Sequence, residues 1–191
     1  MKINNNSGNF DTSNKSHCGM VYWITGLSGS GKTTVAKYFF DLLISKGYKA
    51  LIIDGDDLRQ IIKGGFSKNE RTKQAKKYSK LCKLFSEQGI IVIAAVGALV
   101  NSIQKWNRLN IKNYVEVFLN VPLEELESRN KKNLYSNFKE GKVNNIVGLD
   151  IKADFPEKPD IEVKNYGQET SIDSAKKIYN FHKNFENIEK L

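Results

Sequence analysis

One run of nine residues in this sequence has the composition and spacing of a loop that holds a phosphate chain. It matches G-x-x-x-x-G-K-[ST] at every required position, between an apolar run and a helical pattern. In such loops the glycines let backbone N–H groups turn toward phosphate oxygens, and the helix start adds a partial positive charge. The lysine, Lys32, reaches the β- and γ-phosphates, and the Thr33 hydroxyl takes one coordination position on Mg²⁺. The predicted nucleotide and Mg²⁺ site consists of Gly26, Leu27, Ser28, Gly29, Ser30, Gly31, Lys32, Thr33 and Thr34.

Three carboxylates follow a second apolar run, at Asp54, Asp56 and Asp57. If that run is a strand of a parallel sheet, they lie at its carboxyl end, where open α/β sheets bind ligands. A carboxylate there holds Mg²⁺ through water or accepts a proton from an attacking hydroxyl. We assign this metal-side or base chemistry to Asp56, and interpret Asp57 as the N-cap of the next helix.

Short apolar runs alternate with longer segments of helical periodicity from residue 20 onward. Continuous apolar strands separated by helices are typical of a parallel sheet covered on both faces. The expected fold is therefore a three-layer α/β domain over residues 20–191, with five parallel strands. The expected strands are 20–25, 49–54, 90–96, 113–121 and 160–165, and the expected helices are 32–46, 70–88, 101–110, 123–129 and 171–186.

Two segments fall outside this alternation. Residues 1–19 are polar and rich in Asn and Ser, and we expect a disordered leader. Residues 130–158 are rich in Lys and Asn; a segment of this length inside a domain is usually functional or disordered, and we interpret it as a lid. Because no apolar run is long enough to span a membrane and the leader lacks a signal-peptide core, we expect a cytoplasmic protein without a membrane partner.

The formal net charge of +9 has two interpretations. It indicates either an anionic partner, such as nucleic acid or a nucleotide, or a lysine-rich solvated surface. The basic residues are spread over many segments, and no recognisable nucleic-acid-binding motif accompanies them. We therefore expect no specific nucleic acid, and keep a basic, ATP-using nucleic-acid-binding protein as the alternative of another class.

Four blocks of this sequence resemble the adenylylsulfate (APS) kinase family of P-loop kinases, over roughly residues 20–165. GLSGSGKTT and DGDDLR resemble the family's GLSGxGKTT and DGDxxR. Glu70-Arg71, a long helix and GIIVI are similar to its next block. Arg129 and Lys132-Asn133-Leu134-Tyr135 resemble its lid motif R-x-x-K-G-L-Y, and residues 148–156 resemble G-I-D-x-P-Y-E-x-P.

The resemblance implies a kinase that moves the γ-phosphate of ATP to the 3′-hydroxyl of a nucleotide conjugate. In the namesake reaction APS becomes PAPS, a step of sulfate assimilation. The resemblance further implies a homodimer, with ATP and Mg²⁺ bound by Lys32 and Thr33, and a lid closed over the transferring phosphate by Arg129 and Lys132. Forked arginine donors suit anionic groups. The residues that we assign to acceptor binding are Asp54, Arg59, Arg71, Gln74, Trp106, Lys132 and Leu134.

The departures from the family pattern are concentrated on the acceptor side. Residues 96–101, VGALVN, stand where the family has F-I-S-P-Y-R, so an aromatic ring and an arginine are missing. Gln74 replaces an asparagine, and Lys152-Ala153-Asp154 replaces P-Y-E. A lost base stack costs ~1–3 kcal/mol and a lost bidentate contact about as much, together roughly two to four powers of ten in acceptor preference.

Trp106, with the neighbouring Arg108, is a candidate replacement for the missing ring and charge, core packing on a helix being the alternative. The departures resemble a branch of APS-kinase-like proteins associated with bacterial surface-polysaccharide synthesis. That resemblance implies a different acceptor, such as cytidine diphosphoramidate. The altered residues themselves indicate only that the acceptor pocket has changed.

Overall fold

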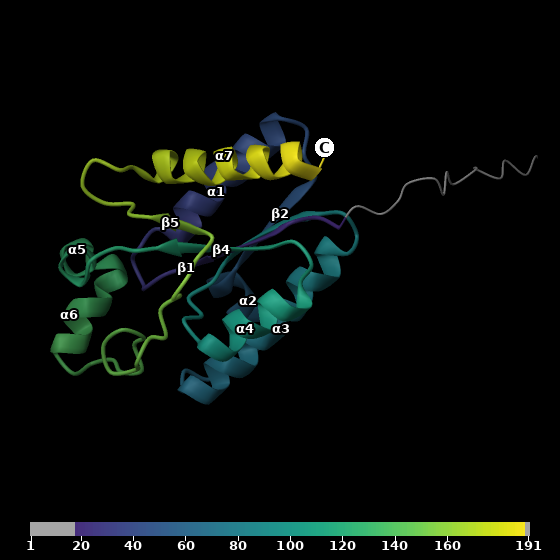
Figure 1. The fold of residues 1–191 in the computed structure, drawn as a ribbon. Helices are drawn as coiled ribbons and strands as arrows, with labels where there is room; N and C mark the ends of the chain where they lie inside the picture. The colour runs from purple at the N-terminus through teal and green to yellow at the C-terminus, as the bar shows by residue number, and fades with distance from the viewer. Residues whose placement is uncertain (1–17, 190–191) are drawn as a thin grey trace, which may run out of the picture.

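The computed structural model describes residues 18–189, with side chains to residue 185. Residues 1–17, most of the expected leader, lie outside the described residues. A five-stranded sheet lies between two helical layers, with α1 and α7 on one face and α2, α3 and α4 on the other (Figure 1). This is the three-layer α/β architecture that the alternating apolar runs predict.

All strand pairs of the sheet are parallel, and the strand order is β2-β3-β1-β4-β5. The expected strands are confirmed, each with slightly shorter bounds. Their carboxyl ends therefore lie along one edge, where ligands bind in this class of sheet. The strands are β1 (Val21–Thr25), β2 (Ala50–Asp54), β3 (Ile91–Ala95), β4 (Tyr114–Leu119) and β5 (Ile161–Val163).

The central strand β1 is buried on both faces, and its side chains alternate between two cores. Tyr22 packs with residues of α1 and α7, including Phe39 and Ile178. Trp23 packs on the opposite face, in the core that α3 and α4 cover. The main helices are α1 (Lys32–Ser45), α3 (Lys68–Ser86), α4 (Asn101–Asn110), α5 (Leu123–Arg129) and α7 (Ser171–Glu189).

A short helix that the apolar pattern did not reveal, α2 (Gly55–Ile61), begins directly where β2 ends. Its N-cap is Asp54, whose side chain accepts a hydrogen bond from the Asp56 N–H at 2.8 Å. The expectation that Asp57 caps this helix is therefore wrong: Asp57 lies in its first turn. The strand-to-helix change is so abrupt that the last strand residue is also the cap.

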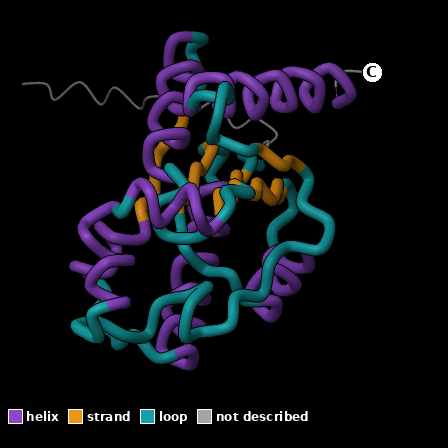
Figure 2. Tube along the Cα trace, turned by 90° about the vertical axis from the view of Figure 1, so that its left-hand side faces the viewer, coloured by secondary structure: helices purple, strands orange, loops and turns teal. Residues whose placement is uncertain are grey.

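The segment expected to be a lid has structure of its own. It contains the 3₁₀ turn η1 (Lys131–Asn133) and the helix α6 (Leu134–Lys139) before a long loop. In Figure 2 the long loops run on the side of the strands away from α7. The Tyr135 hydroxyl donates to the Ser28 carbonyl at 2.8 Å, so α6 is fastened to the phosphate loop.

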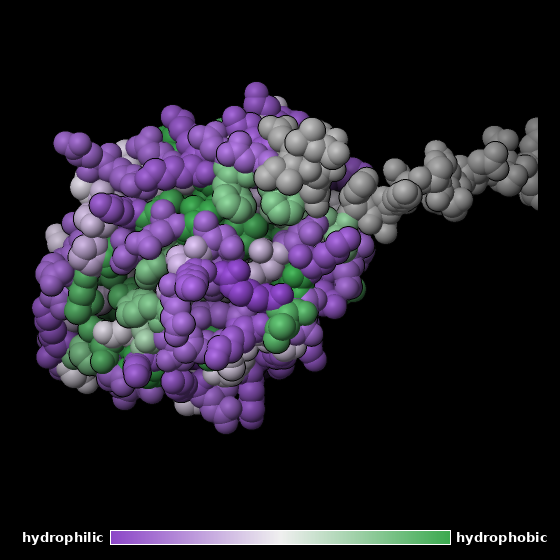
Figure 3. All heavy atoms as spheres, in the orientation of Figure 1, coloured by the Kyte–Doolittle hydropathy of each residue, from purple (hydrophilic) through white to green (hydrophobic). Residues whose placement is uncertain are grey.

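The face of the molecule drawn in Figure 3 is mainly polar. In Figure 3 hydrophilic residues cover most of α7 and of the layer formed by α3 and α4. No helix in the described part of the chain is long and apolar enough to cross a membrane. Both cysteines, Cys18 and Cys82, are free.

Candidate functional site

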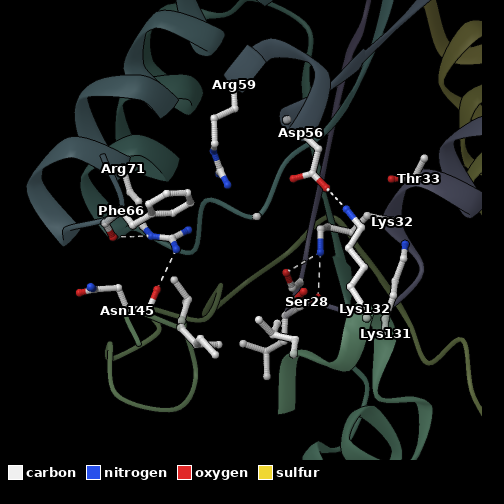
Figure 4. A pocket seen from close by; sticks show the side chains of 18 of the residues that line it. Ser28, Lys32, Thr33, Asp56, Arg59, Phe66, Arg71, Lys131, Lys132 and Asn145 are labelled. Atoms are coloured by element: carbon white, nitrogen blue, oxygen red, sulfur yellow. Dashed lines mark hydrogen bonds and ion pairs between the residues drawn. The ribbon is translucent and has the colours of Figure 1, made fainter. Parts of the chain in front are cut away.

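A cavity of about 570 Å³ opens at the carboxyl ends of the strands, and three segments far apart in the sequence form its walls (Figure 4). The phosphate loop forms its floor, the start of α2 and the region before α3 form one wall, and the lid segment forms the other. The predicted site residues that line it are Gly26, Leu27, Ser28, Gly29, Gly31, Lys32, Thr33, Asp54, Asp56, Arg59, Arg71, Lys132 and Leu134.

The phosphate loop has the left-handed backbone that its glycines allow. Gly31 has φ +94°, and a Cβ there would lie 2.3 Å from the Asn165 amide nitrogen. That amide donates to the Ser30 carbonyl at 2.6 Å, so a residue after β5 holds the loop from behind. Only glycine satisfies both the backbone angle and the close approach.

Lys32 folds back over the loop that precedes it. Its Nζ donates to the carbonyls of Gly26 (3.0 Å) and Leu27 (2.8 Å). Enclosure by the loop lowers the pKa of Lys32 to about 8; Asp56 opposes this shift, and Lys131 adds to it. The ammonium is therefore held where a phosphate chain would lie, and an incoming anion would stabilise its charged form.

The hydroxyl of Thr33 and the carboxylates after β2 form an oxygen-rich corner of the cavity. Thr33 Oγ1 donates to Asp54 Oδ2 at 2.6 Å. Oxygen donors of this kind are those that Mg²⁺ prefers. The structure thus places Asp54, assigned to the acceptor from the sequence, beside the hydroxyl assigned to the metal.

Asp56 projects into the cavity from the first turn of α2. Its Oδ2 lies 3.3 Å from Lys132 Nζ, across the cavity mouth (Figure 4). Both side chains are mostly exposed, 69% for Asp56 and 74% for Lys132, so the pair contributes only about 0–1 kcal/mol to stability. The contact is therefore easily exchanged for a contact with substrate.

Two arginines and a phenylalanine form the far wall. The guanidinium carbons of Arg59 and Arg71 lie 5.3 Å and 5.5 Å from the ring centroid of Phe66. Arg71 donates to the carbonyls of Phe66 (2.7 Å) and Asn145 (2.8 Å), which joins α3 to the lid loop. Burial, followed by repulsion from Arg59, lowers the pKa of Arg71. Within the described residues neither guanidinium has an acidic side chain at ion-pair distance, so both charges are available to an anion.

Arg129 lies on the other side of the phosphate loop. It donates to the carbonyls of Asn165 (2.7 Å) and Gly29 (3.3 Å) and lines a second cavity of about 440 Å³. Thr34 and Lys131 also line that cavity, together with residues 165–167 and 169–171. Gly29, Gly31 and Lys131 line both cavities, which therefore meet at the phosphate loop.

Three of the expected site residues line neither cavity: Ser30, Gln74 and Trp106. Ser30 is buried, and its carbonyl accepts from Asn165. Gln74 is buried and donates to the Gly65 carbonyl at 3.4 Å. From the sequence we assign Gln74 and Trp106 to acceptor binding. In the structure the packing of α3 instead buries the Gln74 side chain.

Trp106 packs between α3 and α4, away from the cavity. Its ring lies 3.6 Å from Lys76 Nζ, and it contacts the core on that face of the sheet. The neighbouring Arg108 is paired with Glu116 (2.9 Å) and Asp160 (3.1 Å). Trp106 and Arg108 therefore supply neither the missing ring nor the missing charge, because Trp106 packs on α3 and Arg108 is held in ion pairs.

Sequence reasoning missed Phe66, Lys131 and the loop residues 142–147, all of which line the first cavity. A signal for Phe66 was present. It directly precedes Ser67, the N-cap of α3, whose side chain accepts from the Glu70 N–H in a capping box. The helix start fixes the direction of an apolar side chain that directly precedes the N-cap. Which surface that side chain contacts depends on the fold.

Comparisons with known proteins agree with this geometry. Residues 18–164 match the family model described as adenylylsulphate kinase. An adenylyl-sulfate kinase of Clostridium acetobutylicum is 35% identical over 170 residues, 86% of this chain and 85% of its own. A cytidine diphosphoramidate kinase of Campylobacter jejuni is also 35% identical, over 146 residues, 76% of this chain and 85% of its own.

A solved structure of the APS kinase of Mycobacterium tuberculosis, in complex with AMPPNP and APS, has the same fold. It superimposes with a TM-score of 0.81 at 27% identity, covering 86% of this chain and 98% of that one.

Proposed function

The chain belongs to the adenylylsulphate kinase family, and from that premise we propose that it transfers the γ-phosphate of ATP to the 3′-hydroxyl of a nucleotide conjugate, APS being the first candidate. Membership makes the chain a kinase that phosphorylates a hydroxyl group, with ATP and a small nucleotide as substrates. The identity of the conjugate and the roles of the individual residues are the proposal.

The observation that carries the proposal is the meeting of two cavities at one phosphate loop. The second cavity, beside Arg129 and Thr34, has room for the donor nucleoside. The first holds Arg59, Phe66 and Arg71 at its far wall, an aromatic face flanked by two cations. An aromatic face can stack on the base of the acceptor, and the two guanidinium groups can bind the acceptor's anionic groups. The acceptor would thus face the donor phosphate across Lys32.

In the proposed reaction the acceptor hydroxyl attacks the γ-phosphorus in line, the new O–P bond forms, and ADP leaves. Asp56 takes the hydroxyl proton or orients the oxygen, which requires that it exchange Lys132 for the substrate. Lys32 and Lys132 then lie on either side of the transferring group. Their charges stabilise the oxygens of the transition state, which is most of what phosphoryl transfer needs.

The oxygen-rich corner of Thr33, Asp54 and Asp56 fits Mg²⁺. We propose that the Thr33 hydroxyl holds the ion directly and that the carboxylates hold it through water. The ion, when bound, would neutralise charge on the β- and γ-phosphates. Thr33 would then turn its hydroxyl oxygen from Asp54 toward the cation.

A second candidate acceptor, a cytidine diphosphoramidate-type conjugate, is favoured by the wall after β3. Gly97 lines the cavity there without a side chain, within the segment where the family carries an aromatic ring and an arginine. The remaining base platform would be Phe66. With fewer contacts from this wall, the pocket would discriminate between acceptors less strongly than the pockets of the family's namesake enzymes.

The decisive experiment measures ADP release from MgATP by the purified chain, with APS and cytidine diphosphoramidate as alternative acceptors. Turnover of APS would support sulfate activation, and turnover of the cytidine conjugate alone would support capsule-polysaccharide modification. Absence of acceptor-dependent ADP release with both would contradict the proposed acceptors. Sedimentation of the same sample tests the further proposal, from the family resemblance, that the chain is a homodimer.

A further inference from the structure

Lys131 stands beside Lys132 in η1, at an unspecified position of the lid motif R-x-x-K-G-L-Y. Figure 4 shows the two side chains running side by side across the phosphate loop, Lys132 toward Asp56 and Lys131 in the direction of Thr33. Consecutive residues of a regular helix would diverge by about 100°. Here they share a direction because Lys132 has a left-handed backbone (φ 60°, ψ 25°), as do its neighbours Asn130 and Asn133.

The position of Lys131 is fixed against the phosphate loop itself. A Cβ built on Gly29 would lie 3.9 Å from the Lys131 Cβ, which is ordinary van der Waals contact. α6 holds this arrangement from the next turn, through the bond from Tyr135 to Ser28. The start of the Lys131 side chain therefore lies close to the loop that is expected to hold the phosphates.

Lys131 also lies at the junction of the two cavities, lining both of them. Within the described part of the chain no acidic side chain forms an ion pair with Lys131, whereas Lys132 has Asp56. A lysine without an ion-pair partner at this junction is placed to contact a polyanion that passes from one cavity into the other.

We propose that Lys131 is an additional phosphate-binding residue of the lid, which contacts the donor triphosphate where it passes from the second cavity into the first. Lys132 would then serve the transferring phosphate beside Asp56, and Lys131 the phosphates closer to the nucleoside. This inference rests on the proposed donor site but not on the identity of the acceptor. The lid thereby has two lysines with separate tasks.

The test is the dissociation constant of the Mg²⁺ complex of AMPPNP, a non-transferable ATP analogue, measured by calorimetry without an acceptor. Lys131→Met should weaken binding by roughly tenfold or more, since it removes a charge-assisted contact, and Lys131→Arg should restore most of it. The matched control is Lys139→Met, which removes the same charge from α6, where Lys139 pairs with Glu127 and lines neither cavity.

Adenosine, which lacks phosphates, separates phosphate contact from a structural effect. Its affinity should be the same in Lys131→Met and in the parent. Equal weakening of adenosine and AMPPNP, or an AMPPNP constant within about twofold of the parent, would overturn the proposal.

The outcome is distinguishable from failure of the proposed function. Because AMPPNP binding needs no acceptor, a chain that phosphorylates neither APS nor the cytidine conjugate still reports on Lys131. Conversely, normal turnover with unchanged AMPPNP affinity in Lys131→Met would leave the kinase intact and remove Lys131 from its donor site.

Discussion

Lys132 Nζ lies 3.3 Å from Asp56 Oδ2, so a lid residue holds the carboxylate that we assign to chemistry. The pair joins segments 76 residues apart in the sequence. Since both side chains are largely exposed, the pair costs little to break, and both partners are available when substrates bind. The contact that spans the cavity mouth thus keeps two reactive groups close to their expected positions.

Asp56→Asn should lower the rate of phosphoryl transfer by roughly a hundredfold or more, the usual contribution of a general base. Affinity for MgAMPPNP should change little, since the amide keeps the shape of the side chain. Single-turnover ADP formation and calorimetry measure the two quantities. The control is Asp57→Asn in the same turn, which lines neither cavity. A near-normal rate in Asp56→Asn would refute the assignment.

Lys32→Ala should abolish transfer, because the P-loop ammonium contacts the β- and γ-phosphates.

In the parent, the pKa of about 8 for Lys32 predicts that affinity for MgAMPPNP is constant below pH 7 and falls above pH 8. Affinity falls with rising pH because only the charged form of Lys32 binds phosphate strongly. The lowered pKa means that Lys32 loses its proton at a lower pH than an ordinary lysine. Above pH 8 binding should take up a proton, visible as a buffer-dependent heat. A flat affinity from pH 7 to 9.5 would exclude this coupling.

Phe66→Ala should raise the KM for the acceptor by roughly fivefold to a hundredfold and leave the KM for ATP unchanged, since a base stack contributes ~1–3 kcal/mol. Steady-state kinetics with each substrate varied in turn make the comparison. Phe155→Ala is the matched control: Phe155 is also exposed, but its ring packs at a tilt against Phe118 and lines neither cavity. Equal effects of the two substitutions on the acceptor KM would remove Phe66 from the site.

Trp106→Ala separates the two interpretations of that residue. Its packing against α3 and Lys76 predicts a loss of about 2 kcal/mol or more in the free energy of unfolding, less than for a fully buried aromatic. The acceptor KM should stay within about twofold of the parent. Urea unfolding and steady-state kinetics test both parts. A large rise in acceptor KM with unchanged stability would restore the sequence-based interpretation.

The lid proposal predicts that residues 130–158 exchange amide hydrogens more slowly when MgAMPPNP and an acceptor are both bound. The two lysines of η1 and the loop after α6 would then contact substrate, and local opening would become rarer. Exchange followed by mass spectrometry resolves this segment. The same exchange pattern with and without nucleotides would show that the segment is not a lid.

The sequence by itself determined the elements and the phosphate loop. Apolar runs of strand length and helical periods are local patterns, and they predicted the five parallel strands and their flanking helices. The loop from Gly26 to Thr33 is likewise continuous in sequence, so its glycines and lysine have fixed relations to strand and helix. Short elements such as α2 and α6 lack enough residues for a period to show.

Only the tertiary structure decided which distant side chains share a cavity. Thr33 meets Asp54 across the sheet edge, Arg71 meets the carbonyl of Asn145, and Trp106 turns away toward α3. Those outcomes depend on how helices pack on the sheet and on single left-handed residues such as Lys132. The physical reason is that local sequence sets backbone periodicity, whereas the direction of a side chain relative to a remote segment is set by packing of the whole core.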